Sequence, residues 1–312
     1  MSRRNDNLTI WADRAYLSLA ARVFTVNFSL CTSNCVRAGE YHATMSKHTL
    51  PAWQSIEKVV IGMCHCPALP GSPNCSGYLA PIREHVLRDA RALASGGVHG
   101  IMLENFGDVP FYPGRVPAHV VAHLTAIAAM VKQETKLPLG INVLRNDGIS
   151  ALAVAHAADA DFIRVNVLSH ARLTDQGVLQ AIAHDLLRER MLLGATNIQI
   201  LADVDAKESV PLAPGLSLED EIDDVTRRGL ADGIVVSGAN TGGAADPSKV
   251  GKAYAAAGKT PVFIGSGVRA ANIEQYMSAA DGFIVGTSLK GGGDVRAAID
   301  VNLVRELMQR VR

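Results

Sequence analysis

The chain has no excess of charge of either sign and few aromatic residues. Its 312 residues carry 30 basic and 30 acidic side chains, and Phe, Trp and Tyr together make up 5%. Proteins that bind nucleic acid or an anionic membrane surface usually present a basic patch, and single-strand binders add aromatic side chains on which bases stack. We therefore expect no nucleic acid partner and no binding to an anionic membrane surface.

Long apolar runs and a cysteine framework are absent as well. No segment approaches the roughly 20 apolar residues that cross a bilayer, so we expect no membrane span. The five cysteines are an odd number, which argues against a disulfide framework, and the C-x-C of Cys64 and Cys66 has no second pair at zinc spacing. We expect packing cysteines in a reduced, cytoplasmic protein.

Residues 1–44 lack the alternation of apolar and amphipathic runs that follows them. They contain scattered arginines with Ser and Thr, as a transit peptide would, which would place the protein in an organelle matrix. Asp6, Asp13 and Glu40 weigh against that interpretation, and a start codon assigned too early, with Met45 as the true beginning, is favoured. We expect a non-barrel extension over 1–44 and one domain over 45–312.

From about residue 58, short runs rich in Ile and Val alternate with longer amphipathic segments, as in parallel strands covered by helices. The expected strands are Val59–Met63, Gly100–Leu103, Leu139–Val143, Phe162–Val165, Ile198–Ala202, Gly233–Val236, Val262–Ile264 and Phe283–Val285. The expected helices include Ile82–Ser95, Val120–Thr135, Ile149–Ala158, Val178–Leu193 and Leu218–Arg228.

Eight such units predict an α/β protein with a single closed (β/α)8 barrel of the TIM type. An open doubly wound sheet would instead place G-x-G-x-x-G after the first strand, where this chain has HCPALPGSP (65–73). The Pro- and Gly-rich segment Cys66–Ala80 is expected to form a loop over the barrel mouth.

The last two strands each end in a glycine-containing turn. Backbone N–H groups in such turns can converge on an anion, and barrels frequently build a phosphate site from the loops after strands seven and eight. Two ordinary tight turns remain the plainer alternative. The candidate phosphate ligands are Gly265, Ser266, Gly267, Gly286, Thr287, Ser288 and Lys290.

Polar side chains follow the other strands, at the barrel end where chemistry takes place in this fold. Arg164 lies within an apolar run, so it needs an acidic partner, Glu104 or Asp203. That pair could be structural, or it could hold a carboxylate or phosphate. The candidate substrate-binding residues are Asn142, Arg145, Arg164, Asn166 and Ser237.

Four residues are candidates for the chemistry. Glu104 and Asp203 could form an acid/base pair or bind Mg²⁺. Lys207 could be a general base, an electrostatic clamp or a Schiff-base nucleophile, and His65 either an acid/base or a structural residue. No H-x-H or H-E-x-x-H pattern supports a zinc hydrolase.

Seven phrases together resemble the BtpA/SgcQ family, from about Lys58 to Arg312. They are LENFGDVPF (103–111), INVLRND (141–147), FIRVNV (162–167), ADVDAK (202–207), IVVSGANTG (234–242), IGSGV (264–268) and DGFIVGTSLK (281–290). The resemblance implies a TIM-type barrel. One branch is named for a role in photosystem I biogenesis and another for a sugar-utilisation gene cluster. Where the family usually has Val-Lys-His, this chain has Ala206-Lys207-Glu208, which puts in doubt a mechanism that needs that histidine.

Two functions follow as hypotheses. The first is an enzyme acting on a small phosphorylated metabolite, a phosphosugar or nucleoside-derived phosphate, by lyase, isomerase or glycosidic-cleavage chemistry. On this hypothesis Asp203→Asn and Lys207→Met should lose activity with folding intact. The second is a non-catalytic biogenesis or stability factor for a membrane complex, as the family name implies. A homo-oligomer is compatible with either.

Overall fold

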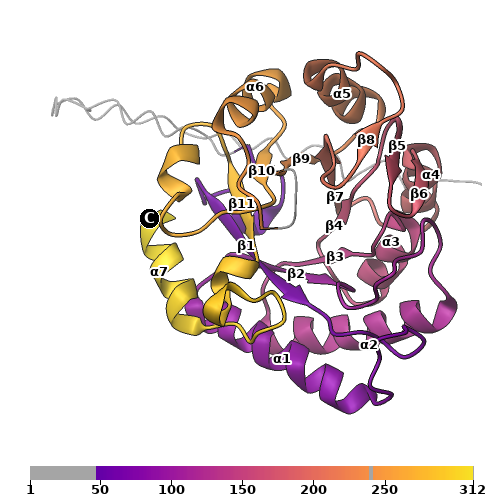
Figure 1. The fold of residues 1–312 in the computed structure, drawn as a ribbon, viewed down its shortest axis with the longest axis vertical. Helices are drawn as coiled ribbons and strands as arrows, with labels where there is room; N and C mark the ends of the chain where they lie inside the picture. Colours follow the sequence, from indigo (N-terminus) through magenta and orange to yellow (C-terminus); the bar gives the residue numbers. More distant parts are fainter. Residues whose placement is uncertain (1–46, 239–241, 312) are drawn as a thin grey trace, which may run out of the picture. The chain divides into compact units, whose positions relative to one another are not determined.

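The computed structural model describes residues 47–238 and 242–311, so the expected extension over 1–44 lies outside the described residues. Eight parallel strands close into a barrel in the order β1-β11-β10-β9-β7-β4-β3-β2, which confirms the predicted (β/α)8 fold (Figure 1). The barrel strands are β1 (Val59–His65), β2 (Gly100–Glu104), β3 (Leu139–Asn142), β4 (Phe162–Val165), β7 (Gln199–Val204), β9 (Gly233–Val236), β10 (Val262–Ile264) and β11 (Gly282–Val285).

The barrel strands lie where the apolar runs predicted them, because these runs have to be buried on both faces. Nearly every residue of the eight strands is buried, since one face packs inside the barrel and the other against the helices. The predicted bounds of β4, β9 and β10 are confirmed, and the other strands differ by one or two residues at their ends.

Helices surround the barrel (Figure 1). Within α1, the apolar side chains Ile82, Val86, Ala90 and Leu93 recur at helical spacing and are all buried. The described helices are α1 (Leu79–Gly96), α2 (Ala118–Thr135), α3 (Gly148–Ala157), α4 (Ala183–Leu192), α5 (Leu218–Asp223), α6 (Pro247–Ala257) and α7 (Val301–Val311).

Short turns replace α-helices at several places. A π-helical turn, η2 (Asp224–Arg228), continues α5, and 3-10 turns η3 (Ile273–Tyr276) and η4 (Thr287–Leu289) follow β10 and β11. Two further 3-10 turns are η1 (Pro51–Trp53) and η5 (Gly291–Gly293). The connection between β10 and β11 therefore contains one short 3-10 turn and no α-helix.

A small antiparallel sheet outside the barrel was not predicted. It consists of β5 (Ala171–Thr174), β6 (Gly177–Gln180) and β8 (Val210–Pro211) in the order β6-β5-β8. The expected helix over Val178–Leu193 was wrong in its first part, because those residues pair with β5 as β6 and the helix begins only at Ala183. Buried Arg172 of β5 anchors this sheet through Asp205, at 2.6 Å, and Glu221, at 3.2 Å.

The N-terminal end of the barrel is filled by the segment that precedes β1. Trp53 is 1% exposed, its ring lies 5.2 Å from that of Phe162, and its indole N–H donates to the His99 carbonyl oxygen at 2.9 Å. Leu50 and Phe263 belong to the same apolar cluster, which occupies the barrel interior. The candidate functional residues lie at the opposite, C-terminal end of the barrel, where the strands end in polar side chains.

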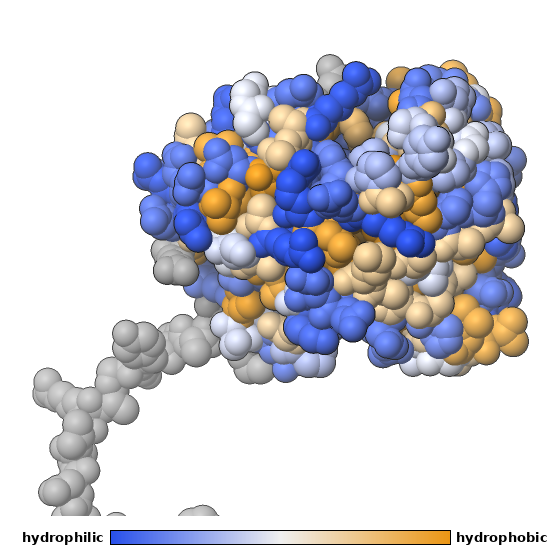
Figure 2. Space-filling model, turned by 90° about the horizontal axis from the view of Figure 1, so that it is seen from below, coloured by the Kyte–Doolittle hydropathy of each residue, from blue (hydrophilic) through white to orange (hydrophobic). Residues whose placement is uncertain are grey.

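The face of the molecule shown in Figure 2 has no dominant apolar patch. This view, from the side of α1 and α2, shows hydrophilic residues interspersed with hydrophobic ones. Among the helices of the described residues, none has both the length and the apolar character required to traverse a bilayer.

Candidate functional site

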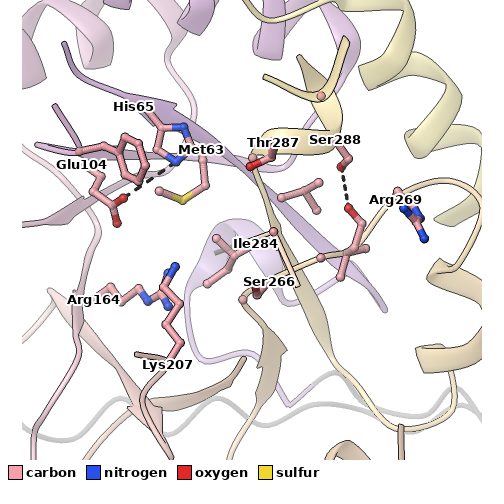
Figure 3. A pocket seen from close by; sticks show the side chains of 18 residues that line it. Met63, His65, Glu104, Arg164, Lys207, Ser266, Arg269, Ile284, Thr287 and Ser288 are labelled. Carbon is pink, nitrogen blue, oxygen red and sulfur yellow. Dashed lines mark hydrogen bonds and ion pairs between the residues drawn. The ribbon is translucent and has the colours of Figure 1, made fainter. Parts of the chain in front are cut away.

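A cavity of about 440 Å³ lies at the C-terminal end of the barrel. Figure 3 shows His65, Glu104 and Arg164 on one side of it, and Ser288 and Arg269 on another. The structure thus gathers candidates that are far apart in the sequence, because parallel strands deliver their carboxyl ends to one rim. The sequence-predicted residues that line the cavity are His65, Glu104, Arg164, Lys207, Gly265, Ser266, Gly267, Gly286, Thr287 and Ser288.

Glu104 and His65 form one wall. Glu104 Oε2 accepts a hydrogen bond from Asn142 Nδ2 at 2.6 Å, which fixes the carboxylate, and Glu104 Oε1 lies 3.9 Å from His65 Nε2. Burial, aided by the positive charges of Lys290 and Lys207, lowers the pKa of His65 to about 3. His65 is therefore a neutral ring at physiological pH, and the contact with Glu104 is not a charged pair.

Asp203 supports this wall from behind. Its two oxygens accept hydrogen bonds from Arg164 Nε at 2.8 Å and Nη2 at 3.0 Å, and Oδ2 also accepts from Asn166 Nδ2 at 2.6 Å. The expectation that Arg164 has an acidic partner is thereby met by Asp203. Because the Asp203 carboxylate is occupied and does not line the cavity, its geometry is that of a positioning residue for Arg164.

Lys207 follows β7 and extends into the cavity beside Arg164 (Figure 3). No hydrogen bond or ion pair joins its ammonium group to any residue that the structure describes. Burial, and next the positive charge of Arg164, lower the pKa of Lys207, whereas Glu104 and Asp203 oppose the change. Lys207 is thus a more available base than a lysine in solution. Arg145 lies outside the cavity and holds the Lys207 carbonyl oxygen at 2.6 Å.

The two glycine turns form the opposite wall. A side chain at Gly267, whose φ is +67°, would place Cβ 2.4 Å from the backbone nitrogen of Ala244, so this turn requires glycine. Ser288 Oγ donates to the Val268 carbonyl oxygen at 2.6 Å and joins the two turns. Within the described residues, no hydrogen bond uses the N–H of Gly267, Thr287 or Ser288, and such free donors suit an anion.

Arg269 and Phe106 line the same cavity and were missed by the sequence analysis. Arg269 is exposed at the rim, directly after the Gly265–Val268 turn, and that position was the signal available in the sequence. Because Asp203 neutralises Arg164 from behind, the remaining charges of the lining are the cations Lys207 and Arg269 against the single carboxylate Glu104. An otherwise neutral chain therefore carries a cationic cavity.

Lys290 and Ser237 do not line this cavity. The Lys290 side chain is buried on another side of β11, and its ammonium group donates to the Val295 carbonyl oxygen at 2.6 Å. Ser237 is buried behind Gly265, where its Oγ would lie 2.9 Å from an added Cβ. These positions give no support to Lys290 as a phosphate ligand or to Ser237 as a substrate-binding residue.

The donor set does not fit the suggested magnesium ion. Both oxygens of Asp203 already accept from Arg164, and Asn166 adds a third bond to the same carboxylate. Throughout 47–238 and 242–311, no group of three or more His, Cys, Asp or Glu is placed to hold a metal ion. Glu104 alone would leave such an ion with one carboxylate ligand.

Comparisons with known proteins identify the family. Residues 56–312 match the BtpA family. The chain is 46% identical over 241 residues to the photosystem I biogenesis protein BtpA of Synechocystis sp., covering 77% of this chain and 83% of that protein. It is 43% identical over 254 residues to an uncharacterized protein of Thermococcus kodakarensis, covering 81% of this chain and 94% of the relative.

Solved structures give the fold alone. The crystal structure of KGPDC from Streptococcus mutans superposes with a TM-score of 0.51 at 9% identity, over 81% of this chain and 97% of that one. Such low identity supports the barrel and carries no information on the reaction. The sequence relationships are far stronger, and by them the chain is a member of the BtpA family.

Proposed function

We propose that the chain is an enzyme that acts on a small phosphorylated metabolite, a phosphosugar or a nucleoside-derived phosphate. One observation carries the proposal: a single cavity joins two walls of different chemistry. One wall has backbone N–H groups without a bonded partner among the described residues, and the other has an oriented carboxylate and a lysine that likewise has no bonded partner there. The first wall has the chemistry to bind a phosphate, and the second has the chemistry to move a proton.

The phosphate would lie against the turns Gly265–Gly267 and Gly286–Ser288. Free N–H donors from two adjacent turns can reach several phosphate oxygens at once, and Arg269 at the rim adds a positive charge. The turns after β10 and β11 continue into short 3-10 segments, so the donors come from the turns themselves and not from the end of a long helix.

The reacting part of the substrate would face Lys207 and Glu104. Lys207, with its lowered pKa, would take a proton from the substrate or act as an amine nucleophile, and Glu104, held by Asn142, would serve as the second acid/base group. Arg164 and neutral His65 would orient polar substrate groups. Isomerisation, aldol-type cleavage and glycosidic cleavage all use such groups.

A thermal-shift screen of the full chain tests this proposal, with ribose 5-phosphate and other sugar phosphates against the same sugars without phosphate. A ligand present at about 100 times its Kd should stabilise the fold by about 2.7 kcal/mol, or roughly 5 °C in Tm. Gly286→Val should abolish the shift, because an added side chain meets His65 Cε1 at 2.9 Å and fills the cavity.

Gly291→Ala is the matched control, because nothing lies within 4 Å of the added methyl group and the residue is outside the cavity. It should keep the shift. Equal stabilisation by ribose and ribose 5-phosphate, or no stabilisation by any sugar phosphate, would contradict the proposed phosphate site.

A second candidate function is a non-catalytic factor for assembly of a membrane complex. The observation in its favour is the name of the Synechocystis relative, a photosystem I biogenesis protein at 46% identity. Sedimentation of the chain with membranes that resists high salt, and is kept by Gly286→Val, would favour this function. Sedimentation lost in that variant would instead tie the association to the cavity.

A further inference from the structure

A second cavity, of about 450 Å³, adjoins the candidate site. His65 and Phe106 line both cavities, and their rings lie 4.7 Å apart at a tilt of 41°. The boundary between the two cavities therefore includes two flat side chains. A ligand that fills the first cavity has a second space of similar size beyond His65 and Phe106.

The second cavity is built mainly from apolar groups. They come from the loop after β1 and the loop after β2, with Val295 from the segment before α7: Cys66, Pro67, Ala68, Val109 and Val295. Asn74, His85 and Arg296 add polar groups. Lys290 also lines this cavity, but its ammonium group is already bonded to the Val295 carbonyl oxygen. This lining fits a flat apolar group with polar edges better than a second phosphate.

His65 offers the second observation. The residue is 9% exposed, and its Nδ1 atom is buried with no hydrogen-bond partner among the described residues. An unsatisfied buried nitrogen costs free energy. Nδ1 is closed to solvent as the ring lies here, so a ligand at the boundary between the cavities would supply the missing partner once the ring turns toward it. As a neutral ring, His65 can either donate to that ligand or accept from it.

We propose that the second cavity is the subsite for a flat heteroaromatic part of the substrate, whose phosphorylated sugar part occupies the first cavity. The substrate class would then be a nucleoside 5′-monophosphate or a close analogue. The ring would stack on Phe106 and bond to His65 Nδ1, and the bond between ring and sugar would lie beside Glu104. This inference rests on the proposed function, because the first cavity has to hold the sugar phosphate.

Calorimetric titration of the full chain with ribose 5-phosphate, AMP and UMP tests the subsite. Stacking of a base on an aromatic side chain contributes about 1–3 kcal/mol, so at least one nucleotide should bind roughly 5- to 150-fold more tightly than ribose 5-phosphate. Ala68→Phe, which fills the second cavity, should remove this advantage. Val109→Trp fills the same cavity from another loop and should do the same.

Ala153→Phe is the control, because Ala153 is exposed on α3 and lines neither cavity. It should keep the nucleotide advantage. Equal affinity for ribose 5-phosphate and both nucleotides would overturn the subsite and leave the proposed function standing. An advantage that persists when Ala68→Phe and Val109→Trp are both folded would also overturn it, whereas no binding of any of the three ligands would overturn the proposed function itself.

Discussion

At the residue scale, the geometry gives different roles to Asp203 and Lys207, two residues that the sequence offered as candidates for the chemistry. Asp203 neutralises a guanidinium group that is almost fully buried, whereas Lys207 has no bonded partner in the described parts of the chain. Replacement of Asp203 should therefore mainly lower stability, whereas replacement of Lys207 should mainly lower activity. Measurements of both properties distinguish the two substitutions.

Asp203→Asn should lower the free energy of unfolding by about 3–5 kcal/mol, because it leaves the Arg164 charge buried and uncompensated. Denaturant unfolding measures this change. The double variant Arg164→Gln with Asp203→Asn should be less destabilised than the sum of the single variants. An unaltered unfolding midpoint in Asp203→Asn would restore the sequence-based expectation that this residue can be replaced with folding intact.

Lys207→Met should reduce kcat by about 100-fold or more and also stabilise the protein. Burial lowers the pKa of Lys207 below the unfolded value of 10.5, so the charged amine destabilises the folded state at neutral pH. Loss of that charge should raise the free energy of unfolding at pH 7 by about 0.5–2 kcal/mol. Below the folded-state pKa of Lys207, the parent carries the full destabilisation from the charged amine. This destabilisation falls as the pH rises from that pKa to 10.5, so the stability gain of Lys207→Met should shrink over the same range.

Unfolding curves of the parent and of Lys207→Met between pH 7 and 10.5 measure this difference. Lys207→Arg is a useful companion because it keeps the charge in the cavity. A Lys207→Met protein that is less stable than the parent at pH 7 would contradict the assignment of Lys207 as a partly buried cation with no bonded partner among the described residues.

At the scale of elements, the turns after β10 and β11 depend on glycine for different reasons. Gly267 adopts a left-handed φ and packs against the backbone of Ala244, whereas Gly286 leaves space for the ring of His65. Neither turn leads into an α-helix, so the backbone N–H donors of this cavity wall result from the conformation of the turns. Loss of that conformation should therefore affect both stability and ligand binding.

Gly267→Ala should destabilise the fold by about 1–3 kcal/mol, because an L-residue is strained at this φ and the methyl group would meet the Ala244 backbone. Gly251→Ala, within α6 and with nothing within 4 Å of the added methyl group, should instead stabilise by about 0.5–1 kcal/mol. Thermal unfolding of the pair gives the sign of each change. Equal effects of the two substitutions would argue against a strained turn at Gly267.

The small sheet β6-β5-β8 shows where local patterns failed. Val178 and Leu179 were assigned to a helix because apolar residues continue beyond them at helical spacing. In the fold, Gly177–Gln180 pairs with β5, and Arg172 ties that strand to Asp205, 33 residues further along the chain. The hairpin turn at Asp175 and Gln176 was a local signal that the apolar spacing outweighed, whereas the contacts of β5 with β8 and of Arg172 with Asp205 join residues too distant in the sequence to leave a local period.

At the scale of the whole molecule, the barrel is closed at one end by apolar packing and opens its polar strand ends at the other. Trp53 fills the N-terminal end, against Phe162 and Phe263. Trp53→Ala should therefore lower the free energy of unfolding by about 3–5 kcal/mol, because a large cavity would remain between the strand ends. Chemical denaturation followed by circular dichroism measures the loss.

Tyr78→Ala serves as the control for an aromatic truncation, because Tyr78 is 73% exposed and its loss should change stability by less than about 0.5 kcal/mol. Ligand binding at the opposite end should survive in folded Trp53→Ala. A change below 1 kcal/mol in Trp53→Ala would mean that the segment before β1 does not contribute to the barrel core.

The sequence by itself determined the eight strands, the order of units and the two glycine turns. These features follow from local rules: a strand buried on both faces must be apolar along its length, and a tight turn after a strand favours glycine, either for a left-handed φ as at Gly267 or for space as at Gly286. The same local rules placed Glu104, His65 and Lys207 at strand ends, and the barrel then brought them to one rim.

Only the tertiary structure decided which polar side chains face the cavity. Asp203 and Lys290 stand at strand ends as Glu104 and Lys207 do, yet Asp203 is bound to Arg164 and Lys290 to the Val295 carbonyl oxygen. Phe106 reaches the cavity although no local pattern marked it, and Arg269 does so from the position directly after the Gly265–Val268 turn. The direction of a long side chain depends on partners from other strands and loops, and burial forces each charge to find such a partner, so that choice is made only when the barrel closes.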